Sequence, residues 1–344
     1  MRILCWAQTD VGQKRDHNED SFLVAADVGL YVVADGMGGH AGGDQASQMA
    51  VSILHETVRR ASLDKRPDGA PLGEEPAALT VLREGARDAG ALIFDLAQQN
   101  PHLAGMGTTL TGLLFHSGRV HLAHVGDSRA YLFRDGRIEQ LSEDHSWINE
   151  QVKAGLITDE EARHSKFKHI ITRSVGFERE VAVDVMSLPV LMGDCFVVCS
   201  DGLSNYMEND ELGRLLTANY YGNVPGLLTD IANERGGDDN ITVLIVYIAN
   251  DSGDPMVTDL SKPDPTRQAT VPGPTAPEDR ERLDDDVDED TADAPVTTNS
   301  THGHLALDKR ADSAAPVDAA EESTPEVGTP AAEEKPGPKS DDDD

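Results

Sequence analysis

The stretch LYVVADGMGGHAGGD, residues 30–44, joins an apolar run to an aspartate and then to a glycine-rich segment. The apolar run stops at Asp35, and five of the next eight residues are glycine. A strand followed by such a turn can cradle a phosphate on backbone N–H groups, or it can be a plain hairpin turn. A third interpretation is that Asp35 is a ligand and that Gly36 gives a bound group access to the backbone.

Acidic residues recur beside other predicted strands. The positions are Asp35 in VVADG, Asp127 in AHVGDSR, Asp201 in VVCSDG and Asp239 in GGDDN, with Arg15, Glu19 and Asp20 in the cluster RDHNEDS. Taken singly, an Asp-Gly pair usually marks a turn. Carboxylates that converge at the edge of a core, however, cannot all stay ionised without cations. The set therefore predicts a site for Mg²⁺ or Mn²⁺, which prefer oxygen ligands.

The order of predicted elements favours antiparallel sheets with helices packed outside, an α+β arrangement, because strands and helices come in blocks. We expect strands within 21–35, 108–142, 195–199 and 240–250 and helices over 43–61, 77–100 and 224–236. Residues 144–165 are predicted to be helical with a break near Gly155. Cys195 and Cys199 are expected on one face of one strand, too far apart for a disulfide and buried in the reduced form.

Composition limits the partners and divides the chain. The formal net charge of −33 argues against nucleic acid and anionic membranes as partners. No apolar run approaches the length of a membrane-spanning helix, and the N-terminus lacks the pattern of a signal peptide, so we expect a cytoplasmic protein. Residues 251–344 hold 26 acidic and 8 basic residues and almost no aromatics. We expect a catalytic domain over 1–250 and a disordered acidic Pro/Thr/Asp-rich tail over 251–344.

Seven motifs carry a resemblance to a known family. RDHNEDS, VADGMGGH, GTTLT, HVGDSRAYL, HIITRSVG, VVCSDGL and GGDDNITV occur in the order typical of the metal-dependent serine/threonine protein phosphatases, the type 2C or PPM family. The resemblance covers residues 5–249 and is greatest to bacterial members that act beside Ser/Thr protein kinases. It implies a four-layer α-β-β-α sandwich of two antiparallel sheets flanked by helices.

The resemblance also implies metal ligands. Asp35 resembles the carboxylate that bridges two metal ions, and Gly36 resembles the residue whose carbonyl oxygen binds one of them. Asp201 and Asp239 resemble the ligands of the other ion. Asp127, together with Asp201, resembles the ligands of a third, weaker ion. The cofactors implied are two Mn²⁺ or Mg²⁺ ions per site, with a possible third.

Other residues match the family's supporting roles. Glu19 and Asp20 resemble residues that hold metal-bound waters, and Arg15 resembles the guanidinium that grips the substrate phosphate. Asn240 is expected to position Asp239. The resemblance implies in-line hydrolysis by a water that the metals activate, without a phosphoenzyme. The stretch 30–44 is then not a phosphate cradle, since it lacks the Gly-Lys-Ser/Thr ending of a P-loop.

Met37 departs from the sequence pattern of many family members, and the segment 144–176 is one that varies among them. Met37 stands where many eukaryotic members have a histidine proposed as general acid, so the general acid is unassigned. The segment from Asp144 to Gly176, called the flap here, resembles the variable flap beside the active site. Its residues Lys166, Lys168 and Arg173 are candidates to guide phosphopeptides, although for the two lysines a solvated loop surface is the preferred interpretation.

Two competing interpretations remain beside the active phosphatase. One is a catalytically weak binding module with the same fold, which the intact acidic set argues against. The other is a phosphatase of an anti-sigma-type regulator, although those relatives generally lack the RDHNEDS-type box. The expected partners are phosphorylated proteins and a Ser/Thr kinase, and the expected oligomeric state is a monomer. Thr270, Thr324 and Thr329 in the tail are candidate kinase targets.

Overall fold

Strand β3 (Leu30–Met37) shows how the layers arise, because its alternate side chains enter two different apolar cores. Leu30 and Val32 face a core shared with helices, whereas Tyr31 and Val33 face a core between two sheets. This is a computed structural model, and it describes residues 2–39, 42–61, 63, 76–163 and 165–249. The continuous apolar run of the sequence therefore marks a strand buried on both faces.

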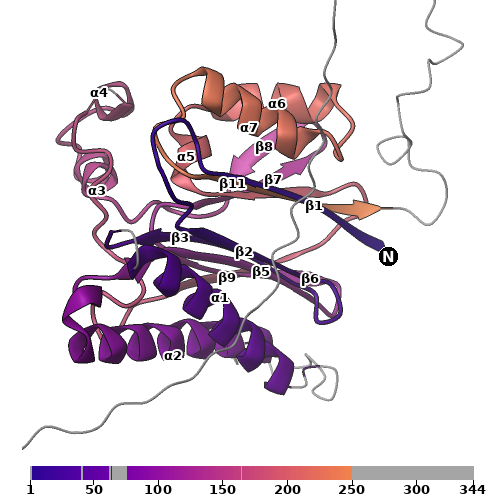
Figure 1. Ribbon diagram of the computed structural model, residues 1–344. Helices are drawn as coiled ribbons and strands as arrows, with labels where there is room; N and C mark the ends of the chain where they lie inside the picture. Colours follow the sequence, from indigo (N-terminus) through magenta and orange to yellow (C-terminus); the bar gives the residue numbers. More distant parts are fainter. Residues whose placement is uncertain (1, 40–41, 62, 64–75, 164, 250–344) are drawn as a thin grey trace, which may run out of the picture. The chain divides into compact units, whose positions relative to one another are not determined.

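Two antiparallel sheets face each other across the inner core (Figure 1). The β11 sheet has the order β1 (Arg2–Asp10), β11 (Ile241–Ala249), β10 (Cys195–Cys199), β7 (Arg129–Arg134) and β8 (Arg137–Gln140). The β3 sheet has the order β2 (Asp20–Ala25), β3, β5 (Leu110–His116), β6 (Arg119–Val125) and β9 (Asp184–Pro189), and β4 (Gly107–Thr108) pairs with β3. The chain crosses from one sheet to the other between β6 and β7.

Helices cover the outer face of each sheet (Figure 1). The β3 sheet is covered by α1 (Gly42–Ala61) and α2 (Ala77–Gln99), and a 3₁₀ turn, Pro101–Leu103, follows α2. The β11 sheet is covered by α5 (Asp201–Ser204), α6 (Asn209–Ala218) and α7 (Val224–Glu234). The predicted α+β, four-layer α-β-β-α sandwich is thus confirmed.

The flap holds two short helices beside the sandwich, α3 (Trp147–Lys153) and α4 (Asp159–Arg163) (Figure 1). The predicted helical break is confirmed, since Gly155 has a left-handed φ of 68° between them. At the base of the flap, Ser146 pairs with Ile171, and Trp147 N donates to Ile170 O at 2.8 Å. The two ends of the flap therefore lie side by side.

Strand β1 was not predicted, although its sequence carries the required alternation. Ile3 and Cys5 face the core between the sheets, and Leu4 and Trp6 face the core under α7. Nine residues of β1 pair in unbroken register with β11. The mixed composition of RILCWAQTD hides this pattern, because the strand lies at a sheet edge and is only partly buried.

Cys195 and Cys199 share the face of β10 that packs under the outer helices, and both are buried free thiols, as predicted. Within the described residues, no helix has the length and apolarity needed to cross a membrane. The expected tail over 251–344 lies outside the described residues. Its disorder, the domain boundary near residue 250 and the cytoplasmic location stay predictions.

Candidate active site

The predicted acidic residues meet at one end of the space between the two sheets. Asp35 continues the inward series of Tyr31 and Val33 along β3, so strand parity points its carboxylate between the sheets. Asp35, Asp127, Asp201 and Asp239 all line one cavity of about 590 Å³, together with Arg15 and Glu19. Four segments far apart in the sequence thus supply one constellation of carboxylates.

The backbone of Asp35 is held by the threonines of GTTLT. Asp35 N donates to Thr109 Oγ1 at 2.9 Å, and Thr109 N donates back to Asp35 O at 2.8 Å. The hydroxyl of Thr108 also donates to Asp35 O, at 2.9 Å. The expectation that the strand ends at Asp35 is wrong by two residues, because Gly36 and Met37 continue β3 by pairing with β4.

Asp20 lies directly beside Asp35, in register across β2 and β3, and is buried beneath the cavity. Its Oδ2 accepts hydrogen bonds from Ser200 Oγ at 2.8 Å and from Thr242 Oγ1 at 2.7 Å. Both donors continue the inward faces of β10 and β11. Hydroxyl groups that follow β10 and lie on β11 in one sheet therefore hold the carboxylate of Asp20, which belongs to the other sheet.

Electrostatics make this cluster unfavourable for anions alone. Burial raises the pKa of Asp20 to about 7, against hydrogen bonds from Thr242 and Ser200, and the charges of Asp201 and Asp239 raise it further. Burial, followed by the charge of Asp20, also raises the pKa of Asp35 well above its usual range. A cation placed among these groups would relieve both the burial cost and the repulsion.

Three carboxylate oxygens fit such a cation. Asp20 Oδ1, Asp127 Oδ1 and Asp201 Oδ1 are buried and have no hydrogen-bond partner in the described part of the chain. Hard oxygen donors of this kind suit Mg²⁺ or Mn²⁺. Across residues 2–249, gaps excepted, no three His, Cys, Asp or Glu side chains already stand as a finished ligand set.

Asp239 is paired with a cationic side chain at the edge of the cavity. Its Oδ2 forms an ion pair with Arg15 Nη2 at 2.8 Å, with Arg15 half exposed. Arg15 therefore stands at the cavity mouth as a guanidinium whose present partner is a predicted metal ligand. A phosphate in the cavity would offer this fork a second partner.

Asn240 contacts two parts of the site, Asp239 and the loop that carries Arg15 and Glu19, whereas only the first contact was predicted. Its backbone N donates to Asp239 Oδ1 at 2.8 Å, in line with the expected positioning role. Its side chain, however, fastens the loop that carries Arg15 and Glu19. The side-chain Nδ2 donates to Val11 O and His17 O, each at 2.9 Å, and Oδ1 accepts from Glu19 N at 2.7 Å.

Gly36 and Gly43 are glycines because the start of α1 comes very close to the end of β3. A Cβ on Gly36 would lie 2.2 Å from Gly43 O, and one on Gly43 would lie 2.0 Å from Glu19 Oε2. Gly38 and Gly39 have φ values of 120° and 78°, which let the chain turn towards α1 as predicted.

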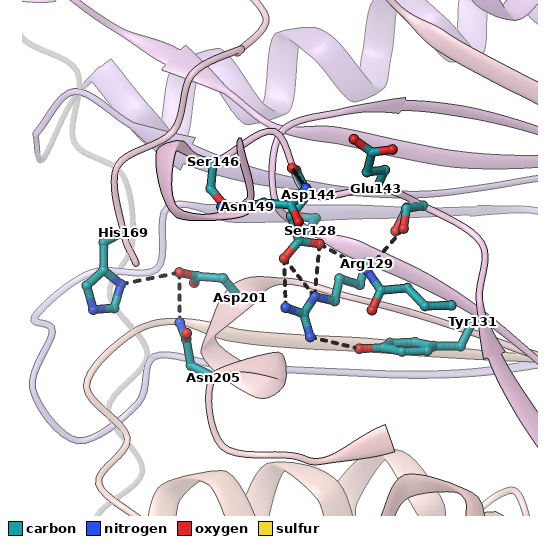
Figure 2. A network of polar contacts seen from close by, with 12 residues as sticks. Ser128, Arg129, Tyr131, Glu143, Asp144, Ser146, Asn149, His169, Asp201 and Asn205 are labelled. Atoms are coloured by element: carbon teal, nitrogen blue, oxygen red, sulfur yellow. Dashed lines mark hydrogen bonds and ion pairs between the residues drawn. The ribbon is translucent and has the colours of Figure 1, made fainter. Parts of the chain in front are cut away.

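The flap contributes part of the cavity wall. Lys168 and Arg173 line the cavity, whereas Lys166 is exposed and lies apart from the lining residues. Arg173 is engaged, since its Nη1 donates to Asp184 Oδ1 at 2.7 Å. His169 Nδ1 approaches Asp201 Oδ2 to 3.8 Å (Figure 2).

Several site residues were missed at the sequence level. Asn205 Nδ2 donates to Asp201 Oδ2 at 3.0 Å, and Tyr206 donates to Asp238 Oδ2 (Figure 2 shows Asn205). Asn205 and Tyr206 follow VVCSDGL, and one turn of helix α5 brings them back over Asp201. The helical spacing of Asp201 and Asn205 was a usable signal, whereas the pairing of Tyr206 with distant Asp238 was not visible in the sequence.

A second cavity of about 1010 Å³ adjoins the first and shares Asp127, Lys168 and Asp201 with it. Arg129 lines this second cavity and forms two hydrogen bonds to Asp144. Its Nε donates to Oδ1 at 3.0 Å, and its Nη2 donates to Oδ2 at 2.7 Å (Figure 2). The GDSR motif is therefore tied to the first residue of the flap.

Comparisons with known proteins agree with this geometry. The family model described as protein phosphatase 2C matches residues 9–223. The serine/threonine phosphatase stp of Listeria monocytogenes serovar 1/2a is 37% identical over 243 residues, which make up 70% of this chain and 93% of the relative. The serine/threonine protein phosphatase PstP of Mycobacterium tuberculosis is 36% identical over 71% of this chain and 45% of its own length.

Solved structures give the same result. The crystal structure of the Mycobacterium tuberculosis serine/threonine phosphatase PstP/Ppp superposes with a TM-score of 0.64 at 33% identity, covering 72% of this chain and 99% of that one. The catalytic domain of PstP in complex with two manganese ions superposes with a TM-score of 0.63, also at 33% identity, over the same shares of the two chains.

Proposed function

Because the chain belongs to the protein phosphatase 2C family, as its motifs predict, we propose that it hydrolyses phosphoserine and phosphothreonine in proteins with divalent cations. The observation that carries this proposal is the meeting of Asp35, Asp127, Asp201 and Asp239 with Arg15 around one cavity. Carboxylates alone would repel a phosphate dianion. A cation-loaded acidic cluster beside a guanidinium attracts one instead.

We propose that Asp35 bridges two cations, that the Gly36 carbonyl binds one of them, and that Asp201 and Asp239 bind the other. The manganese complex of the related PstP catalytic domain supports Mn²⁺ as one usable ion. Mg²⁺ has the same preference for oxygen ligands. When bound, the cations lower the pKa of a water, which supplies the nucleophile near neutral pH.

Asp20, Glu19 and Asp127 have supporting places in this proposal. The buried Oδ1 of Asp20 and the carboxylate of Glu19 accept hydrogen bonds from waters around the cations. Asp127, with Asp201, holds a third and weaker cation, which the unpartnered buried Oδ1 atoms of both residues support.

Arg15 grips the phosphate in the proposed reaction. If Asp239 turned to hold a cation, the Arg15 guanidinium would lose its ion-pair partner and could donate two hydrogen bonds to phosphate oxygens. Asn240 keeps the Arg15 loop in place during this exchange, because its contacts are to the backbone of the loop. Met37 offers no proton donor, so the leaving serine or threonine oxygen takes its proton from solvent in the cavity.

The biological setting follows from the same premise. A protein phosphatase of this type reverses the action of Ser/Thr protein kinases, so we propose that it counteracts one. The intact acidic set argues against a binding module without activity, and Arg15, Glu19 and Asp20 argue against an enzyme restricted to anti-sigma-type regulators. The monomeric state stays a prediction.

Hydrolysis of a small aryl phosphate with Mn²⁺ tests the proposal. Wild type should be active, and both a chelator and Asp201→Asn should remove the activity, since the substitution takes away a charged metal ligand. Asp230→Asn, an exposed aspartate on α7, is the matched control and should leave the rate unchanged. Full activity of Asp201→Asn would refute the metal assignment.

A further inference from the structure

The loop that carries Asp127 is fastened to the base of the flap along its whole length. This crossing loop, Gly126–Ser128, leads from β6 in one sheet to β7 in the other. The segment 141–145 runs along it. Leu141 N donates to Ala130 O at 2.8 Å, Glu143 O contacts His124 Nε2 at 2.9 Å, and Asp144 binds Arg129.

His145 makes the closest connection to the crossing loop. Gly126 N donates to His145 Nδ1 at 3.0 Å, and His145 N donates to Gly126 O at 2.8 Å. An amide N–H can only donate, so Nδ1 must be an acceptor, and the ring proton lies on Nε2. That proton is donated to Asp184 Oδ2 at 3.0 Å. Arg173 Nη1 also lies 2.9 Å from Nε2, but because a guanidinium can only donate, its N–H is directed to Asp184 Oδ1 and not to the protonated Nε2. The ring is thus neutral and held at both nitrogens, and burial, which lowers its pKa, favours this form against the opposing effect of Asp184.

Both ends of the flap meet at the same residue. His145 is the second residue of the flap, and Thr172 N, near the other end, donates to His145 O at 2.9 Å. Arg173 completes the arrangement by donating to the second oxygen of Asp184 at 2.7 Å. One carboxylate therefore orients the imidazole and also binds the arginine that lines the active-site cavity.

The crossing loop leads on to Asp35. Ser128 Oγ and Thr109 Oγ1 are 2.7 Å apart, and Thr109 Oγ1 accepts from Asp35 N. Gly126 has a φ of 108°, and a Cβ there would lie 2.5 Å from Thr109. Hydrogen bonds at Gly126 and at Ser128, joined by the backbone of the crossing loop, therefore connect the flap to the backbone of Asp35.

We propose that His145, oriented by Asp184, is a positioning residue that holds the Asp127 loop and both ends of the flap in one arrangement. The proposal rests on the proposed phosphatase function for its catalytic part only. The two ring nitrogens have separate tasks. Nδ1 fixes Gly126 and thereby the loop with Asp127, and Nε2 fixes the flap through Asp184 and Arg173.

Two substitutions of His145 separate these tasks. His145→Ala removes both contacts, whereas His145→Asn places an acceptor oxygen close to where Nδ1 lies and removes only the contact to Asp184. Asp184→Asn, at a half-exposed position that tolerates change, weakens the flap contact without altering the ring. His121→Ala is the matched control, because His121 is also a buried histidine but lies on β6 of the β3 sheet and faces away from the inner core.

Trypsin cleavage after Lys166 and Lys168 in the metal-free full chain reports on the flap, and kcat for an aryl phosphate at saturating Mn²⁺ reports on the site. For His145→Ala we expect faster cleavage than in wild type and a kcat lower by about 10- to 100-fold, the usual cost of losing a residue that orients a ligand. His145→Asn should regain a large part of kcat but keep the fast cleavage. Asp184→Asn should show fast cleavage with a smaller loss of kcat.

The proposal is overturned if His145→Ala matches wild type in both measurements, or if His121→Ala loses as much as His145→Ala. It also fails if His145→Asn and His145→Ala are equal in kcat, since the two nitrogens would then have no separate roles. Inactive wild type would refute the phosphatase function instead, and the cleavage rates would still test the flap contact.

Discussion

The floor and the rim of the active-site cavity are built in different ways. The floor consists of Asp20 and Asp35, which are set by strand register and hydrogen-bonded to buried hydroxyl groups. The rim consists of Arg15, Lys168 and Arg173, which come from loops and are all partly exposed. Buried charges are costly to change, whereas exposed ion pairs contribute little and exchange partners easily. We therefore expect floor substitutions to alter cation binding and stability, and rim substitutions to alter substrate binding alone.

The largest expected effect comes from Asp35→Asn in the floor. Loss of the bridging charge should lower aryl phosphatase activity by about 10³-fold or more, because metal catalysis stabilises the transition state by several kcal/mol. The same substitution should raise the melting temperature of the metal-free protein at pH 8, since it removes a buried charge that its neighbours repel. Calorimetry with a chelator measures the second effect. Retained activity, or a lower melting temperature, would break the distinction between floor and rim.

Arg15→Lys tests the rim with the next largest effect. Lysine keeps the charge but loses the planar fork, so kcat/KM should fall by about 10- to 100-fold, the worth of one hydrogen bond between charged groups. The melting temperature should stay as in wild type, because the pair with Asp239 is half exposed. Steady-state kinetics and a thermal scan on the same sample measure both. A destabilised variant would show that Arg15 belongs to the floor.

The pH dependence of the protein's stability tests whether the buried carboxylates of the floor destabilise the metal-free protein. Burial raises the pKa of Asp20 from its ordinary value of 3.8 to about 7, so the folded state binds more protons than the unfolded state between these values. The stability of the metal-free protein should therefore fall as the pH rises from about 4 to about 7. Saturating Mn²⁺ at pH 7.5 should restore it.

Asp20→Asn is the control for this titration. The variant lacks the raised carboxyl, so its metal-free stability should fall less over the same pH range, as followed by urea unfolding at each pH. An equally steep fall in the variant would assign the effect to Asp35 and Asp127, whose pKa values burial also raises.

The place of Asp35 in the floor was predictable from the sequence, and the physical reason is local. Apolar runs that end beside Asp35 and Asp201 mark strands buried on both faces, and strand parity decides which way the next side chain points. The motif order then indicated which strands share one end of the sandwich. Strand β1 was not predicted in this way, because it is partly exposed at the edge of the sheet and its sequence therefore mixes polar with apolar residues.

The contacts of the rim and of His145 were not predictable, because they join residues that no local pattern links. The carboxylate of Asp184 lies 39 positions from His145, and the pair exists only because β9 is laid beside β6. Likewise, nothing in RDHNEDS shows that Arg15 pairs with Asp239, or that Asn240 binds the backbone of the Arg15 loop. Such contacts depend on the completed topology.

The smallest expected effect separates two lysines of the flap. Lys168 lines the cavity and Lys166 does not belong to its described lining, so Lys168→Ala should raise the KM for a phosphopeptide while Lys166→Ala should not. The rise should be about two- to fivefold, because one partly exposed charge contributes at most about 1 kcal/mol. A small aryl phosphate, too short to reach the flap, is the control substrate and should show equal KM values for both variants. Equal phosphopeptide KM values for the two variants would mean that the flap lysines act only through the net charge of the rim, and not through contact with the substrate.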